Sequence, residues 1–302
     1  MGKITACGRR VTLALLLPPL LLLSALPARA QLTFPGASPV SSGNIILRNQ
    51  PQFTSSTGGG SSFTDKNVLI YGASPDIAFI LQGNSFVANS ARVGPPGQTR
   101  TETAYGLGDT VLEGRYTIFQ RDGIGSTIRI APYVGLVMPT GMDNANPAMS
   151  RAAQPGTGTW GTRDAMTMSV QTLTWNGGAE AGYQTNAAEV GYRFGNTFFA
   201  DVGAHYLLWP SRLDGQVDSE VYASLEANYT STAPNSAAGG KVPGTGAQLL
   251  LLDPGLIFTT SLYSVSFTGF LPAYERTRGN ASRYTYGAEL LLRLSLFTSY
   301  HL

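Results

Sequence analysis

The residue types that perform catalysis are scarce in this sequence. Of its 302 residues, two are histidines, His205 and His301, and one is a cysteine, Cys7. His301 is the penultimate residue, which leaves His205 as the candidate general base. Such a base needs a nucleophilic hydroxyl group within hydrogen-bond reach, and no serine lies in a G-x-S-x-G elbow. We therefore expect no catalytic residues and no enzymatic activity.

Metal and cofactor sites have no better support. Two histidines argue against a transition-metal site, and the acidic residues show no D-x-D-x-D-G spacing for calcium. The glycines of Gly106-Leu107-Gly108 resemble a nucleotide loop, but they open a predicted strand and no helix follows. We interpret them as easing a bend in that strand. The sequence predicts no bound metal and no cofactor.

The first thirty residues have the pattern of an export signal. Lys3, Arg9 and Arg10 give a positive start, and an apolar stretch at 11–26 follows. Ala28-Arg29-Ala30 is the small-x-small pattern cut by signal peptidase, which predicts cleavage between Ala30 and Gln31. The residues after the arginine pair fit a twin-arginine signal poorly, and Cys7 lies too early for a lipoprotein anchor.

Removal of this signal changes the charge and the redox chemistry. It takes away four of the 20 basic residues and none of the 18 acidic ones, leaving 16 basic residues and a net charge of −2. It also removes Cys7, so the mature chain has no thiol for a disulfide, a metal site or a nucleophile. No basic patch remains, so we expect no nucleic-acid partner.

The mature chain alternates apolar and polar residues with a period of two. In the segment 127–138, for example, Ile128, Ile130 and Val134 share one parity while Arg129 and Tyr133 share the other. Such segments are about 10–14 residues long, whereas strands of globular proteins average roughly 5–6. This length matches the tilted strands of an outer-membrane barrel, which face lipid with their apolar side. The predicted fold class is therefore all-β, a transmembrane antiparallel outer-membrane β-barrel.

Turn and loop signals divide the barrel, residues 44–302, into about twelve strands. We place them near 44–55, 67–73, 77–88, 107–119, 126–139, 164–174, 178–186, 193–208, 216–230, 246–259, 262–272 and 283–302. Long connections (56–66, 89–106, 140–163, 187–192, 231–245, 273–282) alternate with short turns, as in barrels with extracellular loops and periplasmic turns. Within 246–259, Asp253-Pro254-Gly255 indicates a kink in one long strand. Residues 31–43 are predicted to form a flexible periplasmic tail or a plug in the lumen.

The last strand carries an apolar row to the end of the chain. Leu290, Leu292, Leu294 and Leu296 share one parity with Leu302. This row resembles the recognition signal of the outer-membrane barrel assembly machinery, although that signal usually ends in Phe. The predicted partners are therefore this machinery, outer-membrane lipid and a small-molecule solute.

Charged residues collect on the opposite, inward parity. The lumen-lining residues predicted by this register are Glu113, Arg115, Arg129, Asp201, His205, Asp218, Glu220, Glu226, Glu289 and Arg293. Such a mixed-sign lining can select solutes in an open pore. It can equally fill a narrow barrel by pairing across strands, and the sequence leaves both interpretations open.

The chain resembles the bacterial outer-membrane proteins of the phenol-degradation meta-pathway family. The matching motifs, in order, are Gly106-Leu107-Gly108-Asp109, Pro139-Thr140-Gly141, Gly156-x-Gly158-x-Trp160 and Asp253-Pro254-Gly255. The resemblance covers roughly residues 44–302. It implies a barrel that serves as a channel for hydrophobic or aromatic compounds, with no agreed catalytic residues.

The leading hypothesis is an outer-membrane channel for passive uptake of small, hydrophobic or aromatic solutes. The alternatives are a closed structural or adhesion-type barrel, a barrel enzyme that acts on lipid through His205, and a secreted β-sandwich. The last would expose the leucine row of the final strand to water, which favours aggregation.

Overall fold

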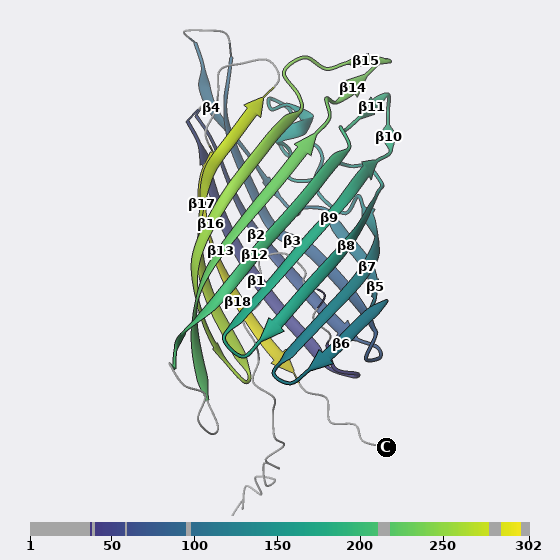
Figure 1. The fold of residues 1–302 in the computed structure, drawn as a ribbon. Coiled ribbons are helices and arrows are strands. Elements are labelled where there is room, and N and C mark those ends of the chain that lie inside the picture. Colours follow the sequence, from purple (N-terminus) through teal and green to yellow (C-terminus); the bar gives the residue numbers. More distant parts are fainter. Residues whose placement is uncertain are drawn as a thin grey trace, which may run out of the picture.

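The computed structural model describes residues 37, 40–57, 59–94, 98–210, 218–277 and 285–296. These residues form an antiparallel β-barrel, with one short 3-10 helix, η1 (Arg151–Ala153), in the connection after β7 (Figure 1). No helix among them is long and apolar enough to cross a membrane. The predicted export signal, with its cleavage site at Ala30 and Gln31, lies outside the described residues.

The wall of the barrel is made of long strands joined to their neighbours in sequence. Its strands are β1 (Ile45–Ser56), β2 (Gly60–Gly72), β3 (Ile77–Val93), β4 (Arg100–Gly106), β5 (Thr110–Tyr116), β6 (Phe119–Gly123), β7 (Ser126–Met138), β8 (Gly161–Thr172), β9 (Trp175–Asn186), β12 (Thr197–Trp209), β13 (Ser219–Thr232), β16 (Ala247–Thr260), β17 (Tyr263–Thr277) and β18 (Thr285–Leu296). Four short strands decorate the loops at one end: β10 (Ala188–Glu189), β11 (Tyr192–Arg193), β14 (Ser236–Ala237) and β15 (Gly240–Lys241).

Pairing of the first and last strands closes the barrel. Ile45 of β1 lies opposite Leu296 of β18, and β1 also pairs with β2 along its whole length. Strands β4 and β5 pair in succession with β3, and β6 pairs with β7, so these three pieces form one interrupted strand. The wall therefore has twelve strands, which confirms the predicted fold class. Strand β1 begins and β18 ends at one end, which we call the periplasmic end.

The predicted loop at 56–66 is wrong. Strand β2 begins at Gly60, so only a tight turn connects β1 to β2. The polar residues from Ser61 to Lys66 lack apolar alternation, which hid the strand in the sequence, but their backbone pairs with β1 in continuous register. The predicted loop at 89–106 and strand at 107–119 are also wrong in their bounds. Strand β3 continues to Val93 and β4 occupies Arg100–Gly106, whereas 107–109 and 117–118 interrupt the predicted strand on either side of β5. The segment 246–259, by contrast, belongs to the single strand β16, as predicted.

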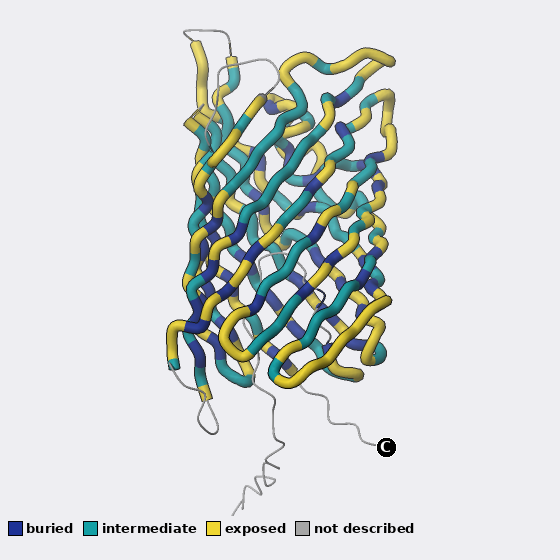
Figure 2. Tube along the Cα trace, in the orientation of Figure 1, coloured by how far each residue is buried: buried dark blue, intermediate teal, exposed yellow. Residues whose placement is uncertain are grey.

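More exposed and more buried residues alternate along many of the strands, as the colours of Figure 2 show. On β7, Val134 and Leu136 are exposed, whereas Ala131 and Tyr133 are buried. The leucine row of β18 from Leu290 to Leu296 is exposed as well. The apolar parity predicted from the sequence is therefore the outer face of the barrel.

The segment before β1 contributes to the interior of the periplasmic end. Val40 is buried in an apolar cluster with Ile46, Ile70 and Ile80, which lie on β1, β2 and β3. Gly72 lies against this segment so closely that a Cβ atom there would be 2.5 Å from the carbonyl oxygens of Val40 and Ser41. The described part of 31–43 thus contacts the barrel, as a plug would.

A charge on the outer face should be costly. Val134→Arg places a guanidinium group where the side chain is 66% exposed to the hydrocarbon layer. We expect a loss of about 2–4 kcal/mol in the free energy of unfolding, measured by urea titration in lipid vesicles. Thr101→Arg, at the exposed far end of β4, is the control and should change it by less than about 1 kcal/mol. Equal losses in the two variants would contradict the assigned outer face.

Candidate functional site

A belt of ionisable side chains lines the interior of the barrel, with most members near the middle of their strands. The acids of this belt are Glu113, Glu180, Asp201, Glu226, Asp253 and Glu289, on β5, β9, β12, β13, β16 and β18. Its cations are Lys66 on β2 and Arg163 on β8. Strand alternation positions all of them, because each occupies the inward parity of its strand.

Arg163 is the centre of the contacts on one side of the belt. Its guanidinium nitrogens lie 3.7 Å from Oε1 of Glu113 and 3.6 Å from Oε1 of Glu180. The Tyr133 hydroxyl donates to Oε1 of Glu180 at 2.9 Å and accepts from Nε of Arg163 at 3.4 Å. The guanidinium group also lies over the Phe199 ring, 4.3 Å from its centroid. One guanidinium group thus lies within ion-pair distance of two buried carboxyl groups.

Side-chain amides donate hydrogen bonds to two acids of the belt, Glu113 and Glu289, without adding charge. Gln82 donates to Glu113 at 2.6 Å, and Gln50 donates to Glu289 at 3.3 Å. Gln52 donates to the second oxygen of Glu289. The carboxyl groups are therefore held by hydrogen bonds as well as by ion pairs.

Acids of neighbouring strands stand directly opposite each other on the remaining side. Glu180 is paired in register with Asp201, and Glu226 with Asp253. Like charges in such cross-strand pairs are destabilising. Near the second pair, His205 Nε2 lies 3.5 Å from Glu226, and Asn228 donates to Asp253. This side of the belt is consequently rich in acceptor oxygens.

Most of the belt is buried, but three members keep contact with solvent inside the barrel. Lys66 and Asp201 are half-buried, and the Arg163 side chain is 27% exposed. Glu113, Glu226 and Glu289 are almost completely buried. The belt therefore narrows the lumen, and both signs of charge border the space that remains.

The structure brings four of the predicted lumen residues into this belt: Glu113, Asp201, Glu226 and Glu289. A fifth, His205, lies beside the belt, 3.5 Å from Glu226. Three others lie inside the barrel nearer the periplasmic end: Arg115 and Glu220 are buried, and Arg293 lies opposite Arg48 on the neighbouring strand.

Two predicted residues lie apart from the belt. Arg129 is at the periplasmic end of β7, where its Nε donates to Gln120 at 3.1 Å. Asp218 precedes β13 and is exposed. His205, the histidine weighed for catalysis, lies 3.5 Å from a carboxyl oxygen of Glu226, and Ser224 stands opposite it in the strand register.

Sequence reasoning missed four members of the belt. Lys66 fell in the wrongly predicted loop, Arg163 one residue before a predicted strand, and Asp253 in a motif interpreted only as a kink. Glu180 lay inside a predicted strand, and counting parity along that strand would have found it.

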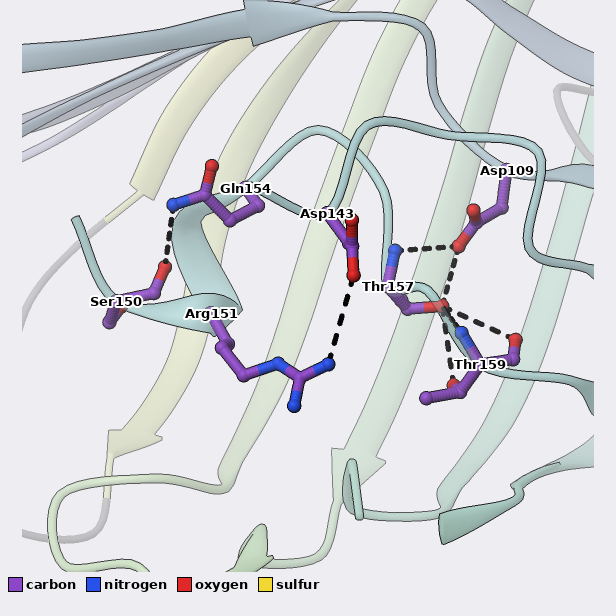
Figure 3. A network of polar contacts seen from close by, with 7 residues as sticks. All are labelled: Asp109, Asp143, Ser150, Arg151, Gln154, Thr157 and Thr159. Carbon is purple, nitrogen blue, oxygen red and sulfur yellow. Dashed lines mark hydrogen bonds and ion pairs between the residues drawn. The ribbon is translucent and has the colours of Figure 1, made fainter. Parts of the chain in front are cut away.

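A second polar network holds the connection between β7 and β8, residues 139–160 (Figure 3). The Asp109 carboxylate, in the break between β4 and β5, accepts hydrogen bonds from the backbone N–H of Gly141 at 3.0 Å and of Thr157 at 2.8 Å. The Thr157 hydroxyl donates to the same carboxylate at 2.6 Å. A single acid thus joins the two stems of this connection to the wall.

Close backbone packing at this clamp requires glycine. A Cβ on Gly141 would lie 2.7 Å from Gly156 Cα, and one on Gly156 would lie 2.5 Å from the carbonyl carbon of Gly141. Gly158 has φ +67° and lies against Asp143. Three of the glycine motifs noted in the sequence, spaced up to about fifty residues apart, therefore meet at one point.

The clamped connection folds against the inside of the wall. Asn89 of β3 donates to the carbonyl oxygens of Ala153 and Gln154, and Gln154 is buried. Asn146 donates to the Thr103 carbonyl on β4, and the Met142 N–H donates to that of Leu107. The loop thereby covers the edge of β4 that pairs with no strand in the described sheet.

The fold and its polar interior define a transmembrane β-barrel of the outer-membrane type. Residues 37–293 match the family model described as "Putative MetA-pathway of phenol degradation", and the chain belongs to this family. No curated protein matches the sequence.

One solved structure supports the fold, and two others show weaker likenesses. The COG4313 outer membrane channel from Pseudomonas putida F1 is similar with a TM-score of 0.60 at 12% identity, over 87% of this chain and 99% of that one. LpxR from Salmonella typhimurium reaches a TM-score of 0.38 at 8% identity, over 83% of this chain and 99% of that one. A Pseudomonas aeruginosa FadL homologue reaches 0.32 at 9% identity, over 83% and 89%. Of these three likenesses, the first is strong enough to bear on the fold.

Removal of the clamp should free the inward loop. Asp109→Ala deletes three hydrogen bonds to a charged acceptor, so we expect trypsin to cleave after Arg151 roughly tenfold faster or more. The measurement is the rate of appearance of the two fragments by mass spectrometry. Asp122→Ala, an exposed acid at the opposite end, is the control and should leave this rate unchanged. An unchanged rate in Asp109→Ala would show that the loop is held by other contacts.

Removal of the shared cation should destabilise the belt. Arg163→Met leaves Glu113 and Glu180 without their ion pair, so we expect a loss of about 3–5 kcal/mol in the free energy of unfolding. Arg163→Lys keeps the charge and should lose less. Adding Glu113→Gln and Glu180→Gln to Arg163→Met should restore part of the loss in the same urea titration. No recovery would show that packing, rather than charge, explains the effect.

Proposed function

We propose that this protein is an outer-membrane channel for passive uptake of small solutes, hydrophobic or aromatic compounds among them. The observation that carries the proposal is the charged belt inside a closed barrel, with Lys66, Asp201 and Arg163 still reached by solvent. A closed structural barrel does not need both positive and negative side chains on the solvent-exposed surface of its lumen. The family and the similarity to an outer membrane channel support the same class.

The path through the interior combines polar and apolar surfaces. The belt offers hydrogen-bond acceptors and cations, whereas the apolar cluster of Ile46, Val68, Ile70 and Ile80 at the periplasmic end packs with Val40 and would be reached by a solute only if the segment before β1 moved. A solute with an aromatic ring and a hydroxyl group can use both surfaces in turn. The family description, which refers to phenol degradation, supports aromatic cargo.

Delivery to the outer membrane belongs to the same proposal. The segment 1–30 would direct export and be cleaved between Ala30 and Gln31. The outward leucine row of β18 would be recognised by the barrel assembly machinery and then contact lipid, since Leu290 to Leu296 are exposed.

Conductance in a planar lipid bilayer tests the proposal. We expect the purified protein to insert and conduct, and Asp201→Asn to reduce its preference for cations because one carboxylate at the solvent boundary is removed. The reversal potential in a salt gradient measures this preference. Asp218→Asn, exposed and outside the belt, is the matched control.

The same experiment separates the channel from its alternatives. An inserted protein that shifts its electrophoretic mobility on boiling but never conducts would be a closed structural or adhesion-type barrel. A conducting protein should also let phenol into liposomes faster than protein-free liposomes do, and equal rates would exclude aromatic uptake. Hydrolysis of lipid that is abolished by His205→Ala would instead indicate an enzyme.

A further inference from the structure

A hollow of about 700 Å³ lies on the outer wall of the barrel over β18, β1, β2, β3 and β5. Exposed leucines border it, including Leu47, Leu69 and Leu81 on successive strands and Leu292 and Leu294 on β18. Its floor also includes Asn49, Asn67 and Ser85, which are polar residues on the lipid-facing parity. Polar groups at such a position need a physical reason, because hydrocarbon cannot hydrogen-bond to them.

The depth of the polar floor places it within the hydrocarbon layer. On β2, Asn67 is midway between Phe63 and Tyr71, two exposed aromatic residues of the same parity. Aromatic residues mark the two interfaces of a transmembrane barrel. Asn49 lies opposite Asn67 in register, so it has the same depth. The floor is therefore near the middle of the bilayer.

The hydrogen bonds of the floor converge on Asp65. Asn49 Nδ2 donates to Asp65 Oδ1 at 2.6 Å and to Asn67 Oδ1 at 3.1 Å. Asn67 Nδ2 donates to Ser85 Oγ at 2.9 Å and to Asp65 Oδ2 at 3.4 Å. The Ser85 hydroxyl donates to Asp65 Oδ2 at 2.5 Å. These bonds use every side-chain hydrogen that the two amides and the hydroxyl can donate.

Among the outward-facing side chains that line the hollow, the hydrogen-bonding capacity that remains is acceptor capacity; Asp65 is not part of the lining but accepts hydrogen bonds from the two amides that are. The two oxygens of a carboxylate have about four lone-pair sites, and three donors reach Asp65. Within the described part of the chain, Asn49 Oδ1 receives no recorded hydrogen bond. A molecule that adds a stabilising contact here must therefore bring its own O–H or N–H donor, and its remainder must suit the leucines around the hollow.

We propose that this hollow binds a small apolar molecule carrying a hydroxyl group, of the alkylphenol kind, taken directly from the hydrocarbon layer. The volume is within the range of small-molecule sites, roughly 300–1,000 Å³. Thr140 also lines the hollow, and its hydroxyl lies 2.8 Å from that of Thr110. It directly precedes Gly141, whose backbone N–H is held by Asp109. The proposal rests on the proposed function in one respect, because it takes the bound molecule to be a solute that the channel transports.

A labelled protein in lipid nanodiscs tests the site. In a Cys7→Ser background, Leu81→Cys provides one thiol at the border of the hollow for an environment-sensitive fluorophore. The probes are 4-butylphenol and butylbenzene, which differ in the hydroxyl group. We expect a saturable fluorescence change with 4-butylphenol and only the linear change of membrane partitioning with butylbenzene.

Two variants localise the binding. Asn49→Leu combined with Asn67→Leu removes both amide oxygens that line the hollow, suits a lipid-facing surface and should weaken 4-butylphenol binding roughly tenfold or more. Asp164→Leu is the matched control, because Asp164 is an exposed acid on the outer face of β8 outside the hollow, and it should bind as the parent does.

Three results would overturn the proposal. Saturable binding of butylbenzene with equal affinity would make the polar floor irrelevant. Unchanged 4-butylphenol binding in the double variant would place the site elsewhere. A disulfide between two copies of the unlabelled Leu81→Cys protein would show that a second copy covers the hollow. Conductance of the same samples separates this site from the proposed function: a parent that binds but does not conduct refutes only the channel.

Discussion

Satisfaction of backbone hydrogen bonds in a layer without water is the constraint on which the rest of this structure depends. Each strand of the wall pairs on both sides, and β1 pairs with β18 so that the sheet has no open edge along most of its height. Where β4 lacks a second strand, Asn146 of the clamped loop donates to the Thr103 carbonyl, and Met142 donates to that of Leu107, just beyond β4. The clamped loop is thus also part of the wall.

This constraint explains why the sequence predicted the fold well. A strand with lipid on one side and a polar lumen on the other must alternate, and parity then assigns Glu113 and Leu290 to opposite faces without any knowledge of their contacts. Prediction failed where alternation is weak. Phe63 is the one apolar residue in 61–67, since Asp65 and Asn67 belong to the polar network on the outer wall while Lys66 joins the belt inside.

The sequence predicted which face of the barrel the residues of the candidate site occupy, but not which residues they contact. Parity placed Asp201 and Glu226 in the lumen, yet it could not reveal that Arg163 serves both Glu113 and Glu180, since these residues lie on three different strands. The role of Asp109 was hidden for the same reason. Its partners Gly141 and Thr157 follow it by 32 and 48 positions and meet it only after the loop turns inward.

The pairing of Ile45 with Leu296 also imposes an order in time. The two strands that close the wall are the first and the last of its strands to be synthesised, so a chain that stops before β18 cannot form a complete barrel. Such a truncated product would expose two unpaired edges, which are sites of aggregation and of attack by proteases. Only a chain that contains β18 can therefore close the barrel, so an incomplete chain is distinguished from a complete one before it inserts into the membrane.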